Sequence, residues 1–139
     1  ILPIFEVMVN GRPAHFFIDT GAPNFAVDRD FARELGLEVA PAGEGVFAGG
    51  RRAPVERTMV SELQLGPIKI ANVPAMVGQS RRFPLRPGVQ MDGIIGTGLL
   101  EHFLSTLDYC DGALVLRPRG ASAGFQRAAR AAGANIVPI

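Results

Sequence analysis

The chain is organised around one stretch, Phe16-Phe17-Ile18-Asp19-Thr20-Gly21-Ala22. Three apolar residues, typical of a buried strand, lead directly into an acid, a hydroxyl and two of the smallest residues. The pattern predicts that Asp19 stands at the end of a buried strand, where a carboxylate needs a partner or a function. Gly21 and Ala22 leave room for another backbone to approach. Taken alone, the stretch favours a buried acid that caps a turn.

The composition is that of a globular domain. A chain of 139 residues, 47% hydrophobic and 19% charged, forms one domain with a real core. Its net charge of +1 gives no electrostatic case for nucleic acid or a membrane surface. No apolar run approaches the roughly 20 residues of a membrane span. The single cysteine, Cys110, excludes an internal disulfide.

Hydrophobic alternation and turn residues predict many short strands. A helix is expected over residues 29–35, capped by Asp28 and ended by Gly36, with further helical segments at 99–103 and 124–132. Residues 38–45 and 78–90 have the composition of loops. The predicted strands are residues 4–9, 13–18, 25–27, 55–65, 68–71, 73–77, 94–95, 104–109 and 113–116, with 136–139 as an edge strand or linker. The sum is a mainly β closed barrel or sandwich.

Two segments between these strands have a possible role in binding. Residues 46–52 read V-F-A-G-G-R-R, a hairpin with a bare glycine tip. On this segment alone we favour an ordinary tight turn, and the alternative is a flexible flap over a ligand. The loop 78–90 holds Arg81, Arg82 and Arg86. Such clusters are usually solvated, although a loop that borders a substrate cleft would prefer acidic side chains.

A second informative stretch is Met91-Asp92-Gly93-Ile94-Ile95-Gly96-Thr97-Gly98-Leu99-Leu100. Its glycine spacing does not fit a dinucleotide fingerprint, and it lacks the Lys-Ser/Thr of a phosphate loop. His15 and His102 have no metal-ligand spacing. We therefore predict no metal and no cofactor.

The two stretches together resemble retropepsin-like aspartic proteases of the bacterial single-domain type. The resemblance rests on D-T-G-A at 19–22, on I-I-G at 94–96 with Leu99-Leu100 after it, and on the glycine hairpin between them. It covers roughly residues 4–116 and implies a retropepsin-like closed barrel with one or two short helices. We assign residues 1–119 to the protease domain and residues 120–139 to a C-terminal tail, short helix or linker.

The resemblance also implies the site residues. Asp19, Thr20 and Gly21 would be catalytic. The residues expected to bind substrate are Ala22, Phe47, Ala48, Gly49, Gly50, Asp92, Ile94 and Ile95. The sequence departs from the retroviral pattern at Pro23-Asn24, where acids are common, and at Thr97, where an arginine often follows the glycine. Both ends of a familiar ion pair are thus lost together.

Peptide hydrolysis by this route needs two carboxylates that share one proton across a water, because like charges that close cannot both ionise. The chain contains one D-T-G, so the second carboxylate would come from a homodimer. We therefore expect an aspartic endopeptidase acting on peptide or protein substrates. Two alternatives remain: a non-catalytic dimerisation or peptide-binding module, and one half of a longer two-domain protease.

The chain begins at Ile1 rather than Met, so we expect a processed or trimmed sequence from which any signal or anchor is missing. The compartment is not fixed by the sequence. A periplasmic or membrane-anchored location is slightly favoured over the cytoplasm.

Overall fold

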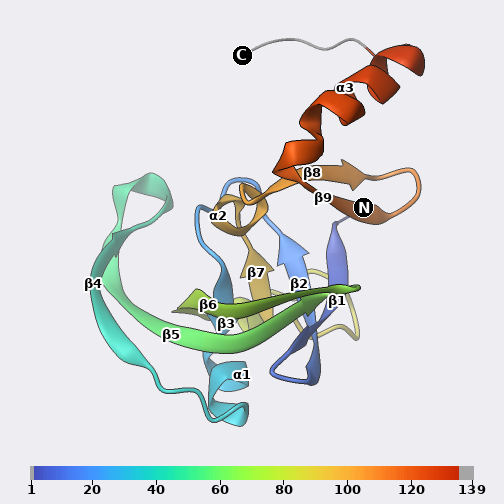
Figure 1. Cartoon of the computed structure of the whole chain (residues 1–139). Helices are drawn as coiled ribbons and strands as arrows, with labels where there is room; N and C mark the ends of the chain where they lie inside the picture. The colour runs from blue at the N-terminus through green and yellow to red at the C-terminus, as the bar shows by residue number, and fades with distance from the viewer. Residues whose placement is uncertain (1, 135–139) are drawn as a thin grey trace. The chain divides into compact units, whose positions relative to one another are not determined.

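A computed structural model of the chain describes residues 2–134 (Figure 1). It divides into two compact units, Ile1–Gly98 and Leu99–Ile139. None of the helices in the described part of the chain is long and apolar enough to cross a membrane.

The first unit is built on a sheet whose order is β1-β2-β7-β3-β6-β5-β4. A further pairing of β1 with β5 closes six of these strands into a barrel, and β4 adds to the outside of β5 (Figure 1). The prediction of a mainly β closed barrel is confirmed. The strands are β1 (Ile4–Val9), β2 (Arg12–Ile18), β3 (Ala26–Asp28), β4 (Ala40–Val46), β5 (Arg52–Leu65), β6 (Ile68–Gly78) and β7 (Gly93–Ile95).

The strand that leads to Asp19 is fixed from both sides. On one side β2 pairs with β1 in an antiparallel hairpin, whose turn residues Asn10 and Gly11 have φ angles of 49° and 77°. These left-handed values are what the tight hairpin turn requires, and Asn-Gly supplies them at low cost. On the other side β2 pairs in parallel with β7. The end of β2 therefore lies inside the sheet and not at its edge.

The strand predicted at residues 13–18 is present as β2, and its alternate side chains Ala14, Phe16 and Ile18 enter the core. Phe16 is fully buried and stacks on Phe25, with ring centroids 5.3 Å apart. Gly93 lies beside this pair, and a Cβ at that position would collide with the Phe16 ring and with the carbonyl oxygen of Ala26. The glycine that begins β7 is thus required by the close approach of β2 and β3.

The helix predicted at 29–35 is present as α1 (Arg29–Glu34), with Asp28 as its N-cap. The Asp28 carboxylate accepts the backbone N–H of Asp30 at 2.8 Å. Two short 3₁₀ turns, η1 (Ala48–Gly50) and η2 (Ser80–Arg82), interrupt the connections that follow.

Two predictions of secondary structure in the first unit were wrong. Residues 40–46 form strand β4 and not a loop, pairing with β5 alone through a register shift between Pro41 and Glu44. A proline is tolerated there because β4 is an edge strand. Residues 68–78 form one continuous strand, β6, and not two, because the pairing with β5 keeps one register on both sides of Asn72, whose φ is 55°.

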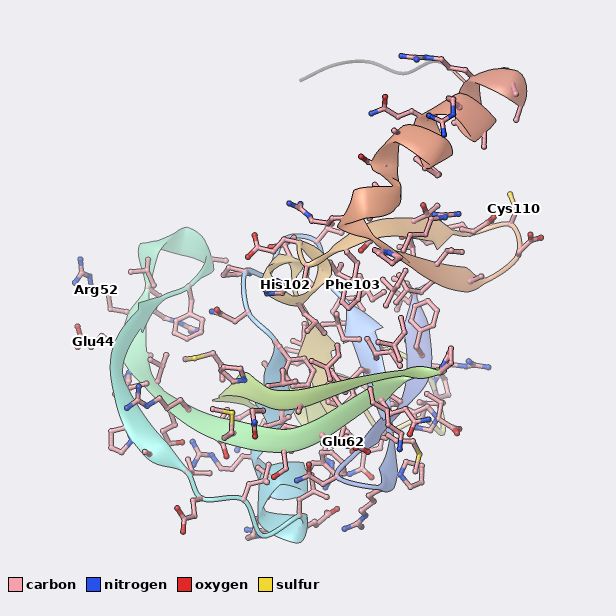
Figure 2. All side chains as sticks on the ribbon, in the orientation of Figure 1. Glu44, Arg52, Glu62, His102, Phe103 and Cys110 are labelled. Atoms are coloured by element: carbon pink, nitrogen blue, oxygen red, sulfur yellow. The ribbon has the colours of Figure 1, made fainter. Side chains whose placement is uncertain are left out.

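The second unit holds an antiparallel hairpin, β8 (Phe103–Asp108) and β9 (Ala113–Pro118), followed by η3 (Arg119–Ala121) and α3 (Ser122–Ala131). The guanidinium of Arg117 stacks 4.7 Å from the centroid of the Phe125 ring, which ties β9 to α3. Cys110 lies exposed in the turn of the hairpin (Figure 2). The edge strand or linker predicted at 136–139 lies outside the described residues, and the domain boundary at residue 119 stays a prediction.

Candidate active site

Asp19 follows the last residue of β2 and is half-buried. Its backbone N–H donates to the carbonyl oxygen of Ile95 at 3.1 Å, which continues the pairing of β2 with β7 by one step. Its Oδ1 atom accepts the N–H of Gly21 at 2.8 Å, and its carbonyl oxygen accepts the N–H of Ala22 at 3.1 Å. The carboxylate is therefore held by its own turn, and the backbone of Asp19 is held by the neighbouring strand.

The residues that follow β7 are hydrogen-bonded to the Asp19 loop. The N–H and Oγ1 of Thr97 both donate to the carbonyl oxygen of Ala22, at 2.9 and 3.3 Å. The N–H of Gly98 donates to the carbonyl oxygen of Pro23 at 2.8 Å. These bonds join the loop to the start of α2 (Thr97–Leu100). They supply an uncharged link at the positions where the sequence lacks the ion pair expected from retroviral enzymes.

Gly96 makes this close approach possible. A Cβ on Gly96 would lie 2.5 Å from the carbonyl oxygen of Ala22 and closer still to that of Asn24. Sequence reasoning did not assign Gly96, Thr97 or Gly98 to the site. The sequence feature that could have identified them is the run of small residues after Ile95, because small residues permit contact between two backbones.

The predicted pocket residues differ in exposure. Ala22 and Ile94 are half-buried, and Ile94 pairs with Phe17 on the neighbouring strand. Ile95 is fully buried, so in this chain its side chain belongs to the core. The structure thus brings Asp19, Gly21, Ala22 and Ile95 together, and leaves Thr20 exposed beside them.

The predicted flap is a hairpin tip between β4 and β5. The N–H of Phe47 donates to the carbonyl oxygen of Arg51 at 2.8 Å, and that of Gly50 donates to the carbonyl oxygen of Phe47 at 3.0 Å. Gly49 and Gly50 have φ angles of 79° and 75°, which only glycine adopts easily. Phe47 is 46% exposed. Within residues 2–134 no hydrogen bond joins the segment 47–50 to the Asp19 loop.

The two faces of the flap ribbon carry different side chains. Figure 2 shows Glu44 and Arg52 on the outer side of the ribbon, pointing away from the barrel. The ring of Phe47 lies close to Gly45 and Val55, since a Cβ on Gly45 would contact both side chains. The flap therefore offers an aromatic side chain that folding has left partly uncovered.

Asp92 is buried and fully bonded. Its Oδ1 atom accepts Nε and Nη2 of Arg81 at 3.0 and 2.8 Å, and its Oδ2 atom accepts the backbone N–H of His15 at 3.1 Å. In the described chain its carboxylate thus contacts protein groups, although the resemblance implied substrate binding.

Of the three arginines in the described loop, only Arg81 has a side chain that is mostly covered by the protein. Its side chain is 13% exposed, whereas Arg82 and Arg86 are exposed. The prediction that this arginine cluster is solvated is therefore wrong for Arg81. The guanidinium also meets both oxygens of Glu34, at 2.5 and 3.1 Å, and stacks 5.5 Å from the Phe31 ring centroid.

The charges of this network stabilise one another. The hydrogen bonds from Arg81 lower the pKa of Glu34 below its ordinary value, with smaller contributions from the charges of Arg81, Arg12 and Arg33. The hydrogen bonds to Glu34 and then to Asp92 raise the pKa of Arg81 further above its ordinary value. Both shifts favour the charged forms of Glu34 and Arg81.

A closed barrel that presents an Asp-Thr-Gly turn at the end of an interior strand defines a class, the retropepsin-like aspartic proteases. A sequence model described as "Aspartyl protease" matches residues 5–99. The chain therefore belongs to the aspartyl protease family. The comparison with curated proteins gives no significant match.

Solved structures show the same fold. A retropepsin-like aspartic protease from Rickettsia conorii is 22% identical with a TM-score of 0.59, over 81% of this chain and 80% of that one. The retroviral protease-like domain of Ddi1 from Leishmania major is 20% identical with a TM-score of 0.53, over 81% and 86%. The EIAV protease in complex with the inhibitor HBY-793 is 18% identical with a TM-score of 0.56, over 73% and 86%. The predicted retropepsin-like fold is confirmed.

Proposed function

We propose that the protein is an aspartic endopeptidase whose active site is completed by Asp19 of a second copy. One observation carries the proposal: Asp19 stands at the end of a buried strand, held by Ile95 and Gly21, in a chain of the aspartyl protease family. The carboxylate is half-buried and bonded only to its own turn among the described residues, so its second oxygen is available for chemistry.

Catalysis would require two such carboxylates close together. Like charges at short distance cannot both ionise, so the pair holds one proton between them. The ionised carboxylate takes a proton from a water, the water attacks the peptide carbonyl carbon, and the protonated carboxyl gives its proton to the carbonyl oxygen. The carboxyl that took its proton from water then gives it to the peptide nitrogen, while the other carboxylate takes a proton from a hydroxyl of the tetrahedral intermediate. The C–N bond breaks, the amine and the carboxylic acid leave, and the pair again holds one proton.

The remaining site residues have supporting roles in this scheme. Thr20 would link the two Asp19 loops through its exposed hydroxyl, and the backbone of Gly21 would hydrogen-bond the peptide. Phe47, Ala48, Gly49 and Gly50 would close over the substrate, which fits the glycine-rich, partly uncovered tip. Ala22 and Ile94 would line the side-chain pockets.

The proposal is tested by cleavage of a peptide library from acid to neutral pH, together with the molar mass in solution. We expect a dimer that cleaves peptides best at acid pH, is inhibited by a statine-type mimic of the tetrahedral intermediate, and loses activity in Asp19→Asn. The matched control is Asp111→Asn, an acid-to-amide change in the exposed β8–β9 turn, which should retain activity.

Each other outcome selects an alternative. Full activity in Asp19→Asn would contradict the mechanism. A dimer that cleaves no peptide at any pH would indicate a peptide-binding module. A stable, inactive monomer would indicate one half of a two-domain protease.

A further inference from the structure

Asp92, which directly precedes β7, is bonded to β2 through its side chain as well as its backbone. Its Oδ2 atom accepts the N–H of His15 at 3.1 Å, and its own N–H donates to the carbonyl oxygen of His15 at 2.8 Å. Both backbone groups of His15 are therefore satisfied by Asp92. Because Asp92 is 6% exposed, water does not compete for these bonds.

This connection matters because the pairing of β2 with β7 is short. The parallel ladder consists of Phe16 with Gly93, Phe17 with Ile94, and Ile18 with Ile95. The bonds between Asp92 and His15 add a fourth step at the beginning of this ladder. The bond from Asp19 to Ile95 forms the last step at its other end.

The register of β7 therefore determines what supports Asp19. A shift by one residue would exchange the faces of Ile94 and Ile95 and would move the Ile95 carbonyl away from the Asp19 N–H. Asp92 opposes such a shift at one end of the ladder, since its bonds to His15 exist in one register only.

Arg81 fixes Asp92 in turn. Its Nε and Nη2 atoms form a fork on Oδ1 of Asp92, and its backbone N–H donates to Oδ2 of Asp28 at 2.9 Å. Asp28, itself 2% exposed, donates its own N–H to the carbonyl oxygen of Asp92 at 2.7 Å. Arg81 thus neutralises Asp92 and joins it to the N-cap of α1. Such planar two-point contact is a property of arginine that lysine lacks.

We infer that Arg81 and Asp92 are positioning residues for Asp19: they hold β7 in the one register that places the Ile95 carbonyl under the catalytic turn. The inference rests on the proposed protease function. Neither residue touches the reacting atoms, and both act through β7.

The test compares Asp92→Asn with Thr58→Val, both of which replace a buried polar group by one of similar shape. The hydroxyl of Thr58 donates to the carbonyl oxygen of Glu38 at 2.6 Å, and Thr58 lies on β5, a strand that pairs with neither β2 nor β7. Peptide cleavage is measured at a temperature at which every variant is folded. We expect kcat to fall by about tenfold or more in Asp92→Asn, with KM changed less than about twofold, and to stay unchanged in Thr58→Val.

Arg81 provides a second set of variants. We expect Arg81→Lys to retain more of kcat than Arg81→Met, because lysine keeps the charge but not the fork. A value of kcat that stays at the wild-type level in Asp92→Asn and in Arg81→Met would overturn the inference. If Asp92→Asn does not fold, Arg81→Lys carries the same comparison.

A measurement that does not depend on catalysis tests this inference separately from the proposed function. Hydrogen exchange of the Asp19 amide, which is bonded to Ile95, should become about tenfold or more faster in Asp92→Asn and should not change in Thr58→Val. This result would support the positioning role even in a chain that cleaves no peptide. Equal acceleration in both variants would show general loosening and would overturn it.

Discussion

The N–H of Asp19 donates to the carbonyl oxygen of Ile95, a residue of a different strand that follows much later in the chain. This one bond joins the two motifs that the sequence placed far apart. Since Thr97 and Gly98 also bond to the Asp19 loop, the backbone of this loop is supported mainly by residues 95–98. Changes in that segment should therefore affect the site without altering Asp19 itself.

Gly96→Ala should destabilise the protein. A Cβ at this position would lie 2.5 Å from the carbonyl oxygen of Ala22, and backbone cannot move aside as a flexible side chain can. We expect the free energy of unfolding to fall by roughly 1–3 kcal/mol or more, measured by urea denaturation. Gly120→Ala is the control, since a Cβ there meets nothing within 4 Å, and its effect should stay within about 0.5 kcal/mol. Equal losses would contradict the packing argument.

Phe16→Ala should cost far more stability than Phe17→Ala, although the two residues are neighbours. Phe16 is fully buried and stacked on Phe25, whereas Phe17 points to the other face of the sheet and is half-buried. We expect a loss of about 3–5 kcal/mol for Phe16→Ala, and a clearly smaller one for Phe17→Ala. Thermal or denaturant unfolding measures the stability of both variants. Similar losses would mean that the side chains of Phe16 and Phe17 do not point to opposite faces of the sheet as described.

Phe47→Ala should reduce peptide cleavage with little effect on folding. At 46% exposure its side chain adds little to the stability of the free chain, and it would be covered only when the flap closes on substrate. Full burial of such a ring contributes about 1.5–3 kcal/mol, and covering the exposed part of Phe47 about 0.7–1.4 kcal/mol, so kcat/KM should fall roughly 3- to 10-fold. Tyr109→Ala, which removes a 54% exposed ring from the β8–β9 turn, should leave kcat/KM unchanged. A fully active Phe47→Ala would exclude the flap role.

The ion pair of Glu34 with Arg81 should make stability depend on pH. Because Arg81 lowers the pKa of Glu34 in the folded state, the pair stabilises the fold above the ordinary value of 4.5. This contribution is lost as the pH falls through the lowered pKa, where Glu34 takes up a proton in the folded protein as well. The melting temperature of Glu34→Gln should therefore lie below that of the wild type at neutral pH.

The same two melting temperatures should converge at strongly acid pH. Glu44→Gln is the control, because Glu44 is exposed and forms no ion pair among residues 2–134. It should follow the wild-type profile throughout. A constant difference between wild type and Glu34→Gln from neutral to acid pH would show that the pair is not the cause.

Local chemistry made much of the fold predictable. The Asn10-Gly11 turn, the Asp28 cap and the strand that ends in the apolar run 16–18 each depend on neighbours within a few positions, and each is present. Strand β4 was missed because almost every residue from 40 to 46 is exposed. An edge strand with neither face buried has no alternation that a sequence could reveal.

The sequence by itself determined that Asp19 would end a buried strand, because three apolar residues followed by Asp-Thr-Gly allow few other arrangements. Only the tertiary structure decided what holds that residue. The parallel pairing of β2 with β7, the bonds of Thr97 to Ala22 and the fork of Arg81 on Asp92 join segments whose separation carries no local pattern. Such contacts form because the closed barrel brings these backbones together, and a buried carboxylate such as Asp92 then requires the cation that folding places beside it.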